Sequence, residues 1–592
     1  MNHTSEQPGR GSRSWPRLTL SRALVAERSW PFFVDLSVAA ALLAGFYAIL
    51  WVAKFWFSSA IPEVQIYRSP AHLPLYAFYS VVRIFVAYAL SLLFAIGYGY
   101  TAAYNKHLEA LMIAVLDILQ SIPVLSFLPG VMLAMMSLFP SRQLGIEFGA
   151  ILLIFTGEVW NMAFSFYTSL KSIPRELMEA CAINRFSRWQ RLFQLELPFA
   201  AIGLIWNSIV SVSNGWFFLM VCEMFPVGSR NFRLPGLGSY LQTAAANGDF
   251  VAVAWGLITM VLIIVIADQV LWRPLIAWSD KFKFENVEST SRVTSPVLDA
   301  LRNSKIVGMI NRYTFRPAAE RFYTDVAQRR RARGPRPERR PSGRGATAVY
   351  LLLAAAALIV IGIAAFHAVL LLKGIQRPEF LGLLAGAGLT FARVNAALLI
   401  GSLWTVPAGV LIGFNPRLSQ IAQPVAQIAA SFPATALFPL ILIALERIGL
   451  GLGIGSVALM LLAAQWYILF NVIAGAQAIP SDLREVSSLF RFSDVQRWTT
   501  VILPGIFPFL ITGLITASGG AWNASIVAEY FQLKGHTLAT PGLGAQISAA
   551  SDHGNYPVLL AATMIMALMV VTINRLVWRP LYHLAETKYR LD

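Results

Sequence analysis

The chain has 592 residues, of which 57% are hydrophobic and only 13% are charged, and its formal net charge is +17. Its mean hydropathy of +0.61 is far above that of soluble globular proteins. These values exclude an ordinary soluble domain and predict that the lipid bilayer is the solvent for most of the chain.

The chain begins with a basic segment, residues 1–31, that contains five arginines. This segment precedes a long apolar stretch and lacks a cleavage site of small residues. We therefore expect a cytoplasmic tail that stays on the protein, and not a signal peptide.

Twelve apolar stretches follow, and each is long enough to cross a bilayer, which takes about 20 mostly apolar residues. They lie near residues 35–57, 77–101, 110–138, 147–166, 199–222, 251–271, 347–373, 382–413, 419–445, 451–475, 502–525 and 556–577. Six stretches precede a polar interval and six follow it. The sequence therefore predicts an all-α polytopic membrane protein with two tandem six-helix units, residues 32–281 and 347–592.

The positive charges indicate the orientation of this protein. If the chain starts inside and alternates through twelve spans, the cytoplasmic segments hold 35 Lys and Arg residues and the external loops hold 7. This asymmetry predicts that both termini are cytoplasmic. Residues 282–346 then form a flexible basic linker between the units. We expect its charge to contact anionic lipid headgroups rather than nucleic acid, because no aromatic-basic platform accompanies it.

The two units are copies of one another. In the second half of each unit the residues match at an offset of 306 without a gap, and in the first half the offset is 310. The matching pairs include Glu179/Glu485, Arg185/Arg491, Glu223/Glu529, Trp272/Trp578, Arg83/Arg393, Pro123/Pro433 and the run Pro-Gly-Leu-Gly at 235–238 and 541–544. Because six is an even number, both copies enter the membrane from the same side. This predicts parallel repeats with a pathway between them.

A polar loop, 172–198 in the first copy and 479–504 in the second, separates the fourth and fifth spans on the cytoplasmic side. Pro174 and Pro480, near the start of the two loops, suit the first turn of a helix, so we expect a first short helix to begin there. Ser-x-x-Gln, at Ser187 and again at Ser493, predicts a capping box that starts a second helix at a new angle. Leu-Pro at 197–198 and 503–504 is expected to end the motif before the fifth span.

These loops resemble the cytoplasmic loop of the inner-membrane permeases of binding-protein-dependent ABC importers, in particular the nitrate/sulfonate/bicarbonate branch. That family has Glu-Ala-Ala, three residues, Gly, about nine residues and Ile-x-Leu-Pro. Here the first copy reads Glu-Ala-Cys-Ala-Ile-Asn-Arg at 179–185 and the second Glu-Val-Ser-Ser-Leu-Phe-Arg at 485–491. The second copy therefore lacks both alanines, and both copies have Arg in place of Gly. A Gly would permit an unusual backbone angle.

The resemblance implies a role for the loops. In the family this loop inserts a coupling helix into an ATPase subunit, and by resemblance the contact is carried here by Glu179, Ala180, Arg185, Glu485 and Arg491. The two arginines either pair with carboxylates of the ATPase or lie on a solvated helix face.

The resemblance also implies the setting and the partners. We expect a permease in a bacterial inner membrane that is not itself an enzyme, works with two ATPase subunits and a periplasmic or lipid-anchored solute-binding protein, and carries a small solute such as nitrate, a sulfonate or bicarbonate. No Walker-type Gly-x-x-x-x-Gly-Lys-Ser/Thr occurs in the sequence, so ATP and Mg²⁺ are expected on the separate ATPase. The alternative is a twelve-helix secondary transporter driven by an ion gradient, which the duplicated loop disfavours.

Polar residues within the spans are candidates for the pathway, or else for hydrogen bonds between helices. The candidates are Asp117, Gln120, Glu158, Asn207, Asn214, Gln427, Gln465 and Asn523. Glu223 and Glu529 are expected to gate the pathway, contact a binding protein or lie as helix-end charges in the interface. Arg83 and Arg393 would attract an anion or snorkel. With two cysteines and no Cys/His cluster, the sequence suggests neither a disulfide framework nor a metal site.

Overall fold

The computed structural model describes residues 64–588, with gaps at 107, 122, 140–142, 225–233, 283–294, 311, 314–316, 318–319, 322–323, 325–358, 360–362, 364–365, 367–368 and 534–535. The chain divides into two compact units, one formed by Met1–Lys54 with Thr290–Pro335 and the other by Phe55–Ser289 with Arg336–Asp592. The predicted tail 1–31 and the predicted span 35–57 lie outside the described residues, as does most of the predicted span 347–373.

The first of these compact units is described only in part. It contains the short helices α12 (Pro296–Asn303) and α13 (Lys305–Ile310), and the Ser295 hydroxyl caps α12 by accepting a hydrogen bond from the backbone N–H of Leu298 at 3.3 Å. The predicted linker 282–346 therefore holds local helical structure that we did not expect from its charge and its Pro and Gly content.

The second compact unit contains the helices of both sequence repeats. The first repeat consists of α2 (Leu73–Tyr104), α3 (Glu109–Ser121), α4 (Leu128–Leu138), α5 (Gln143–Lys171), α6 (Arg175–Ile183), α7 (Arg188–Arg191), α8 (Leu197–Met224), α9 (Leu237–Ala246), α10 (Phe250–Ala267) and α11 (Arg273–Ser279). The second consists of α16 (Arg377–Phe414), α17 (Pro416–Ser431), α18 (Ala434–Arg447), α19 (Leu452–Ala478), α20 (Ser481–Leu489), α21 (Asp494–Arg497), α22 (Leu503–Ala528), β1 (Tyr530–Leu533), β2 (His536–Ala539), α23 (Leu543–Asp552), α24 (Tyr556–Ile573) and α25 (Arg579–Lys588).

Eight helical segments among the described residues are long and apolar enough to cross a membrane. They are Pro70–Tyr104, Gln143–Lys171, Arg188–Glu223, Phe250–Ser279, Arg377–Phe414, Leu452–Ala478, Asp494–Ala528 and Tyr556–Ala585. Each contains all or nearly all of one predicted span. The all-α polytopic architecture with two repeats is therefore confirmed. Among the described residues it includes one small antiparallel strand pair, β1–β2, in the segment between α22 and α23.

Two predicted spans were wrong as single helices. The stretch 110–138 is divided into α3 and α4, with a short 3₁₀ turn between them, and 419–445 is divided into α17 and α18. Pro123 and Pro433 stand at the two breaks. Proline lacks a backbone N–H and disfavours the helical conformation in the residue before it, so an apolar stretch can be continuous while its helix is not.

Leu-Pro was expected to end the polar-loop motif before the fifth span, and α8 and α22 do begin at these leucines. The second helix of each loop nevertheless continues into the long helix through one π-helical turn, Leu192–Glu196 before α8 and Trp498–Ile502 before α22. A proline inside a helix removes one backbone donor, and its ring crowds the preceding turn. The wide π turn lets the chain pass Pro198 and Pro504 without a break.

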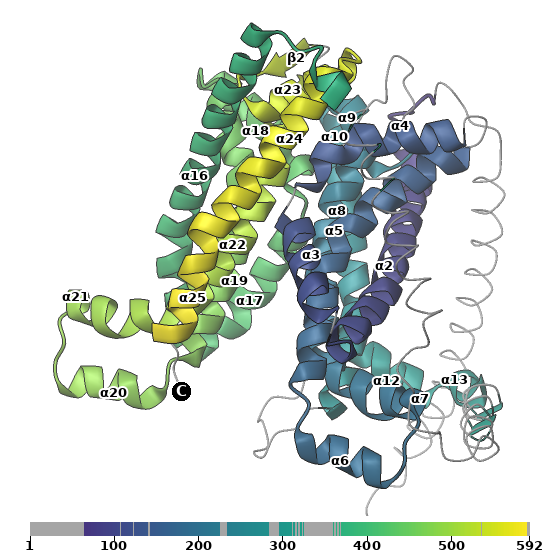
Figure 1. Ribbon diagram of the computed structural model, residues 1–592, viewed down its shortest axis with the longest axis vertical. Coiled ribbons are helices and arrows are strands. Elements are labelled where there is room, and N and C mark those ends of the chain that lie inside the picture. Colours follow the sequence, from purple (N-terminus) through teal and green to yellow (C-terminus); the bar gives the residue numbers. More distant parts are fainter. Residues whose placement is uncertain are drawn as a thin grey trace, which may run out of the picture. The chain divides into compact units, whose positions relative to one another are not determined.

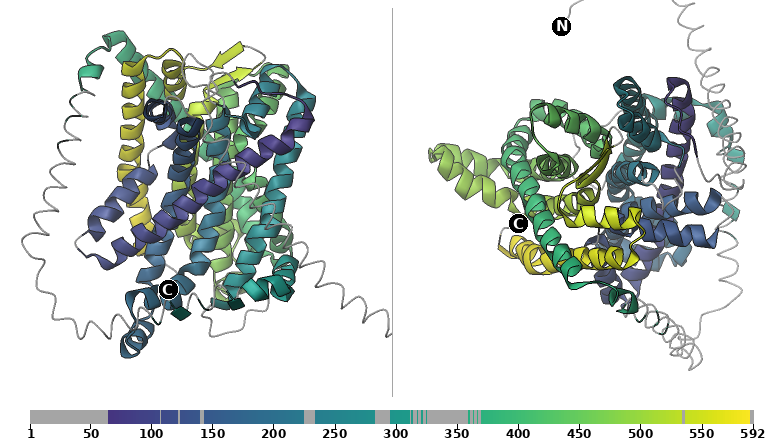
Figure 2. Two further views of the ribbon diagram at one scale, coloured as in Figure 1. Left: turned by 90° about the vertical axis from the view of Figure 1, so that its right-hand side faces the viewer. Right: turned by 90° about the horizontal axis from the view of Figure 1, so that it is seen from above.

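Figures 1 and 2 show how the repeats place their loops within this compact unit. The helix pairs α6–α7 and α20–α21 project from one end of the long helices (Figure 1). The strands β1 and β2 and helix α23 lie at the opposite end (Figures 1 and 2). The polar loops and the external loops of the sequence are therefore at opposite ends of the helices, as the charge pattern predicts.

Candidate functional site

Each polar loop folds into a bent pair of helices, which we call the elbow: α6 and α7 in the first repeat, α20 and α21 in the second. The predicted capping boxes are confirmed. In the first elbow the backbone N–H of Gln190 donates to the Ser187 hydroxyl at 3.2 Å, and the Ser187 N–H donates to the Gln190 side-chain oxygen at 2.8 Å. Ser493 and Gln496 repeat both bonds at 3.4 and 2.9 Å. The bend is thus fixed by local hydrogen bonds.

The turn between the two helices of each elbow has a left-handed residue. Arg185 and Arg491 both have φ of 51°, and they are the two arginines that replace the family's Gly. The next backbone N–H reaches back five residues in both copies, from Phe186 to the carbonyl of Cys181 at 2.9 Å and from Phe492 to that of Ser487 at 3.1 Å. This is the hydrogen bond of a Schellman helix end. The geometry that Gly would favour is therefore kept by Arg, with backbone strain.

We expect Arg185→Gly and Arg491→Gly each to raise the free energy of unfolding by about 0.5–1 kcal/mol. The left-handed strain of about 1–2 kcal/mol disappears, and the extra freedom of Gly in the unfolded chain offsets part of that gain. Melting of the purified full-length chain measures the change. Arg185→Ala keeps the Cβ atom and serves as the control. A lower melting temperature for the Gly variants would show that the arginine side chains stabilise the elbow by more than the strain costs.

The elbows expose apolar side chains outside the spans. Ile183 is 81% exposed, Leu489 78% and Phe490 72%, and all three lie at the C-terminal ends of α6 and α20 or directly after them. The predicted contact residues Glu179, Ala180 and Glu485 are exposed on the same helices, and so are both arginines of the turns. Large apolar side chains gathered in a water-facing loop are typical of a protein interface. Burial raises the pKa of the Cys181 thiol on the inner face of α6.

The first elbow is anchored by a buried carboxylate that the sequence analysis did not single out. Glu196 accepts hydrogen bonds from the Tyr104 hydroxyl and from Nε of Arg191, both at 2.6 Å. These contacts connect the π turn to the last residue of α2. The second repeat replaces the carboxylate by the buried Ile502, and there Arg484 stacks 5.1 Å above the Phe414 ring at the end of α16. Each elbow is therefore fastened to the end of a long helix by an Arg and an aromatic ring.

At the opposite end, the first repeat buries a cluster of charges that we call the clamp. The guanidinium of Arg83 on α2 is 1% exposed. It donates to both carboxylate oxygens of Glu147 at 2.5 and 2.7 Å and to Glu223 at 2.7 Å. It also donates to the carbonyl of Pro235 at 2.8 Å, and Glu223 accepts from the backbone N–H of Gly238 at 2.8 Å. The clamp joins α2, α5, α8 and the Pro-Gly-Leu-Gly turn before α9.

The second repeat builds the same clamp with one carboxylate fewer. Arg393 donates to Glu529 and to the carbonyl of Pro541, both at 2.8 Å. Nη1 of Arg393 makes both of these bonds, and its Nη2 donates to the Thr540 hydroxyl at 2.9 Å. The residue equivalent to Glu147 is Gly453, and the Arg393 side chain is 15% exposed. In both copies the first Gly of the turn is required, because a Cβ atom at Gly236 or Gly542 would overlap the Glu carboxylate.

The clamps correct several expectations. Glu223 and Glu529 are fully buried, so neither is a helix-end charge in the interface or an exposed contact for a binding protein. Arg83 does not snorkel, because its side chain is buried against two carboxylates. With its guanidinium bonded to Glu147, Glu223 and Pro235, Arg83 is held as a structural cation. Arg393 is held by Glu529 in the same way.

Polar contacts between the two repeats involve predicted pathway residues. The Tyr467 hydroxyl on α19 donates to the side-chain oxygen of Asn214 on α8. The side-chain oxygen of Asn523 on α22 accepts from the backbone N–H of Leu125 at 3.3 Å. The first contact joins two long helices near their middle, and the second joins the C-terminal part of α22 to the 3₁₀ turn between α3 and α4. Asn214 and Asn523 therefore lie where the two repeats meet, as a pathway between parallel repeats requires.

The remaining pathway candidates differ in their surroundings. Gln120 is exposed and donates to Asn161 at 3.1 Å, whereas Asn207 donates to the carbonyl of Gly203 on its own helix at 2.9 Å. Gln465 and Glu158 are buried. The side chains of Asp117 and Gln427 lie outside the described ones. The pathway role of these residues stays a prediction.

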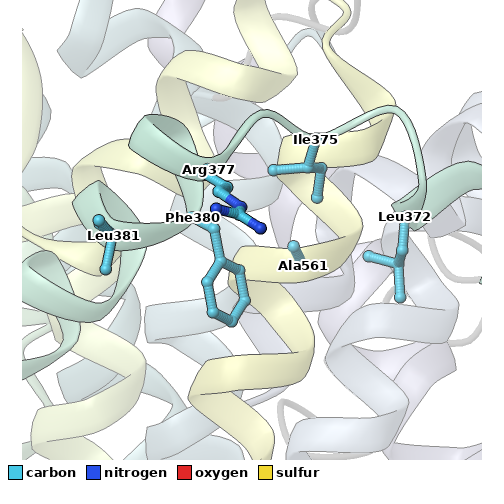
Figure 3. Close-up of a pocket in the computed structure, with 6 residues that line it drawn as sticks. All are labelled: Leu372, Ile375, Arg377, Phe380, Leu381 and Ala561. Atoms are coloured by element: carbon cyan, nitrogen blue, oxygen red, sulfur yellow. The ribbon is translucent and has the colours of Figure 1, made fainter.

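A groove of about 400 Å³ lies away from the elbows and the central contacts, at the N-terminal end of α16 (Figure 3). It is lined by Leu372, Ile375, Arg377, Phe380, Leu381 and Ala561. Arg377 is the single polar side chain among these residues. The groove lacks the several convergent polar groups that orient a small polar solute, and we do not assign it to the pathway.

Comparison with known proteins places these features in a family. The model of the binding-protein-dependent transport system inner membrane component matches twice, at residues 91–271 and 405–579. Each match includes one elbow and most of one clamp. The family match and the apolar helices identify a multi-pass inner-membrane protein.

Individual relatives are permeases. Similar proteins include the nitrate import permease protein NrtB of Leptolyngbya laminosa, 28% identical over 31% of this chain and 63% of its own length. The bicarbonate transport system permease protein CmpB of Synechococcus elongatus is 29% identical over 24% and 49%. The taurine transport system permease protein TauC of Escherichia coli is 26% identical over 31% and 64%. The chain thus spans about half to two thirds of the length of these relatives. It belongs to the binding-protein-dependent transport system inner membrane component family and carries the family's domain twice.

Proposed function

We propose that this chain is the complete permease of an ABC importer, in which one polypeptide supplies both membrane halves and the pathway between them. The observation that carries the proposal is the duplicated elbow, present at the same place in both repeats with the same capping box and the same left-handed Arg. A protein that needs two equivalent contacts with ATPase subunits requires two such elbows, and the chain has them at one end of its helices.

The proposed mechanism transmits motion through the elbows. Two ATPase subunits that close on ATP and Mg²⁺ would pull the exposed faces of α6 and α20 with them. Because each elbow continues into a long helix through a π turn without a break, a displacement of α6 or α20 is passed to α8 or α22 as a rigid-body movement. Asn214 and Asn523 lie on those long helices and would separate from Tyr467 and Leu125. ATP binding then shifts an equilibrium between closed and open pathways.

The proposed partners follow from this arrangement. The elbows would face the cytoplasm, with two ATPase subunits bound there and both termini of the chain on the same side. A solute-binding protein, periplasmic or lipid-anchored, would deliver its solute at the opposite end, near α9, α23 and the β1–β2 strands. Anionic lipids would contact the basic residues between the repeats. The chain itself is proposed to hold no cofactor.

The solute is proposed to be a small anion. The names of the relatives refer to nitrate, bicarbonate and taurine, which share small size and an oxyanion group. The polar side chains at the meeting of the repeats are amides and a phenol, as in Asn214, Tyr467 and Asn523. Such groups offer hydrogen bonds without a fixed charge, so an anion could pass without being held.

Replacement of Glu179 and Glu485 tests the proposal. The full-length chain, tagged and purified from its own host, is expected to bring down an ATPase. Glu179→Gln combined with Glu485→Gln is expected to lower the ATP turnover of that complex about tenfold, which corresponds to about 1.4 kcal/mol of lost coupling. Glu379→Gln, an exposed position at the far end of α16, is the control. Solute uptake that follows an ion gradient in the absence of any ATPase would contradict the proposal and favour a secondary transporter.

A further inference from the structure

A buried carboxyl group in the first repeat has no use in the coupling mechanism. Glu158 lies at the middle of α5 and is fully buried. Neither of its carboxylate oxygens has a partner in good hydrogen-bond geometry among the described residues, although the Ser91 side chain is close by. Helix α8 passes so close that a Cβ atom at Gly215 would overlap Oε1 of Glu158. The glycine therefore makes room for the carboxyl group.

Further oxygen atoms surround this carboxyl group. The hydroxyl of Ser91 on α2 lies beside it, and that hydroxyl also donates to the carbonyl of Phe155 at 3.3 Å. Ser211 on α8 stands one helical turn from Gly215, on the same face of the helix. Ser211 is fully buried and its hydroxyl has no hydrogen-bond partner among the described residues. Three helices thus contribute side-chain oxygen atoms near their mid-length, and we call Ser91, Glu158 and Ser211 the oxygen cluster.

The second repeat lacks the oxygen cluster completely. At the equivalent positions it has Gly401 for Ser91, Ala464 for Glu158 and Ala517 for Ser211. Ala521 replaces Gly215, which fits the loss of the carboxyl group that the glycine accommodates. Ala464, Ala517 and Ala521 are all buried. The fold of the repeat therefore does not require this cluster, and the four positions differ between the repeats as a set.

An isolated carboxylate in this place would be very costly. Transfer of an unpaired charge into a low-dielectric interior is opposed by far more free energy than a protein's stability can supply. Tyr88 on α2 is a titratable group near Glu158, and Ser208 on α8 lies next to the Tyr88 hydroxyl. The guanidinium of Arg83, on the same helix as Tyr88, is bonded to Glu147 and Glu223. Since no basic side chain among the described residues pairs with Glu158, a neutralising proton or cation would come from solution.

We propose that Glu158 is the centre of a binding site for one small monovalent cation, a proton or a sodium ion, held by the oxygen cluster inside the first repeat. Carboxylate, hydroxyl and carbonyl oxygens suit both ions. The bound cation neutralises Glu158 and allows α2, α5 and α8 to pack closely. The site stabilises one repeat and not the other, and it is independent of which solute crosses the membrane.

The test compares wild type with Glu158→Gln, whose amide is neutral at any pH and needs no cation. Melting of the full-length chain in detergent is followed in two series, one with sodium replaced by choline at fixed pH and one from mildly acidic to alkaline pH at fixed sodium. Glu320→Gln, at an exposed position, is the control for general charge effects. We expect the melting temperature of wild type to shift by several degrees in one of the two series and that of E158Q to stay constant in it.

The series that responds identifies the ion. Loss of a sodium response in E158Q assigns sodium, and loss of a pH response assigns a proton. Equal behaviour of wild type and E158Q in both series overturns the proposal. If E158Q does not fold, Glu158→Ala combined with Gly215→Ala takes its place, because the second repeat has alanine at both equivalent positions. A response of this double variant as large as that of wild type is then the overturning result.

Discussion

Replacement of Arg83 by Met is expected to lower the free energy of unfolding by about 3–5 kcal/mol, the usual penalty for removing one partner of a buried ion pair. The substitution leaves Glu147 and Glu223 fully buried without their cation. It also removes the donor to the Pro235 carbonyl and so frees the turn before α9. Melting of the purified chain and the yield of folded protein measure the effect.

The second repeat supplies the matched control for this prediction. Arg393→Met removes the equivalent cation, but it leaves one carboxylate instead of two, in a place where the arginine is 15% exposed. Its effect is therefore expected to be clearly smaller than that of Arg83→Met. Neutralising the first clamp, with Arg83→Met, Glu147→Gln and Glu223→Gln together, is expected to recover part of the lost stability. Equal effects in the two repeats would refute the idea that Glu147 makes the first clamp more dependent on its arginine.

The clamp illustrates the limits of what the sequence predicts. Arg83 and Glu223 were each recognised because the repeat duplicates them, but their pairing was not, since they are 140 residues apart and the apolar pattern carries no information on contacts. One signal was available: two duplicated residues of opposite charge lie in the outer half of the second span and at the outer end of the fifth. Glu147 carried no such signal, because its counterpart in the second repeat is Gly453.

The elbows were predictable to a much greater extent. Their position came from the charge pattern, and their bend came from the capping boxes, because Ser-x-x-Gln acts through bonds within four residues. The left-handed turn was also within reach, since the family has Gly at this place. The sequence alone could not show that Arg adopts the same backbone angle, because tertiary context decides whether such strain is tolerated. The breaks at Pro123 and Pro433 were missed because hydropathy is insensitive to helix continuity.

The exposed apolar ends of the elbows are expected to carry most of the ATPase contact. Ile183→Asp and Leu489→Asp together are expected to reduce capture of the ATPase by the full-length chain by well over tenfold, about 2 kcal/mol or more. Each change would place an unpaired charge in an interface that now buries an apolar side chain. The melting temperature of the chain alone is expected to stay constant, because both side chains are about four-fifths exposed and pack against little of the chain itself.

The control for this experiment is Thr500→Asp, which adds the same charge at an exposed position of the second polar loop, beyond the elbow bend. The single variants distinguish the two contacts. If both elbows bind equivalent subunits, Ile183→Asp and Leu489→Asp weaken capture to a similar degree. The elbows differ in their anchoring, through Glu196 in one and through Arg484 and Phe414 in the other. An unequal loss would therefore indicate that the ATPase depends on one elbow more than on the other. Undiminished capture by the double variant would remove the elbows from the interface altogether.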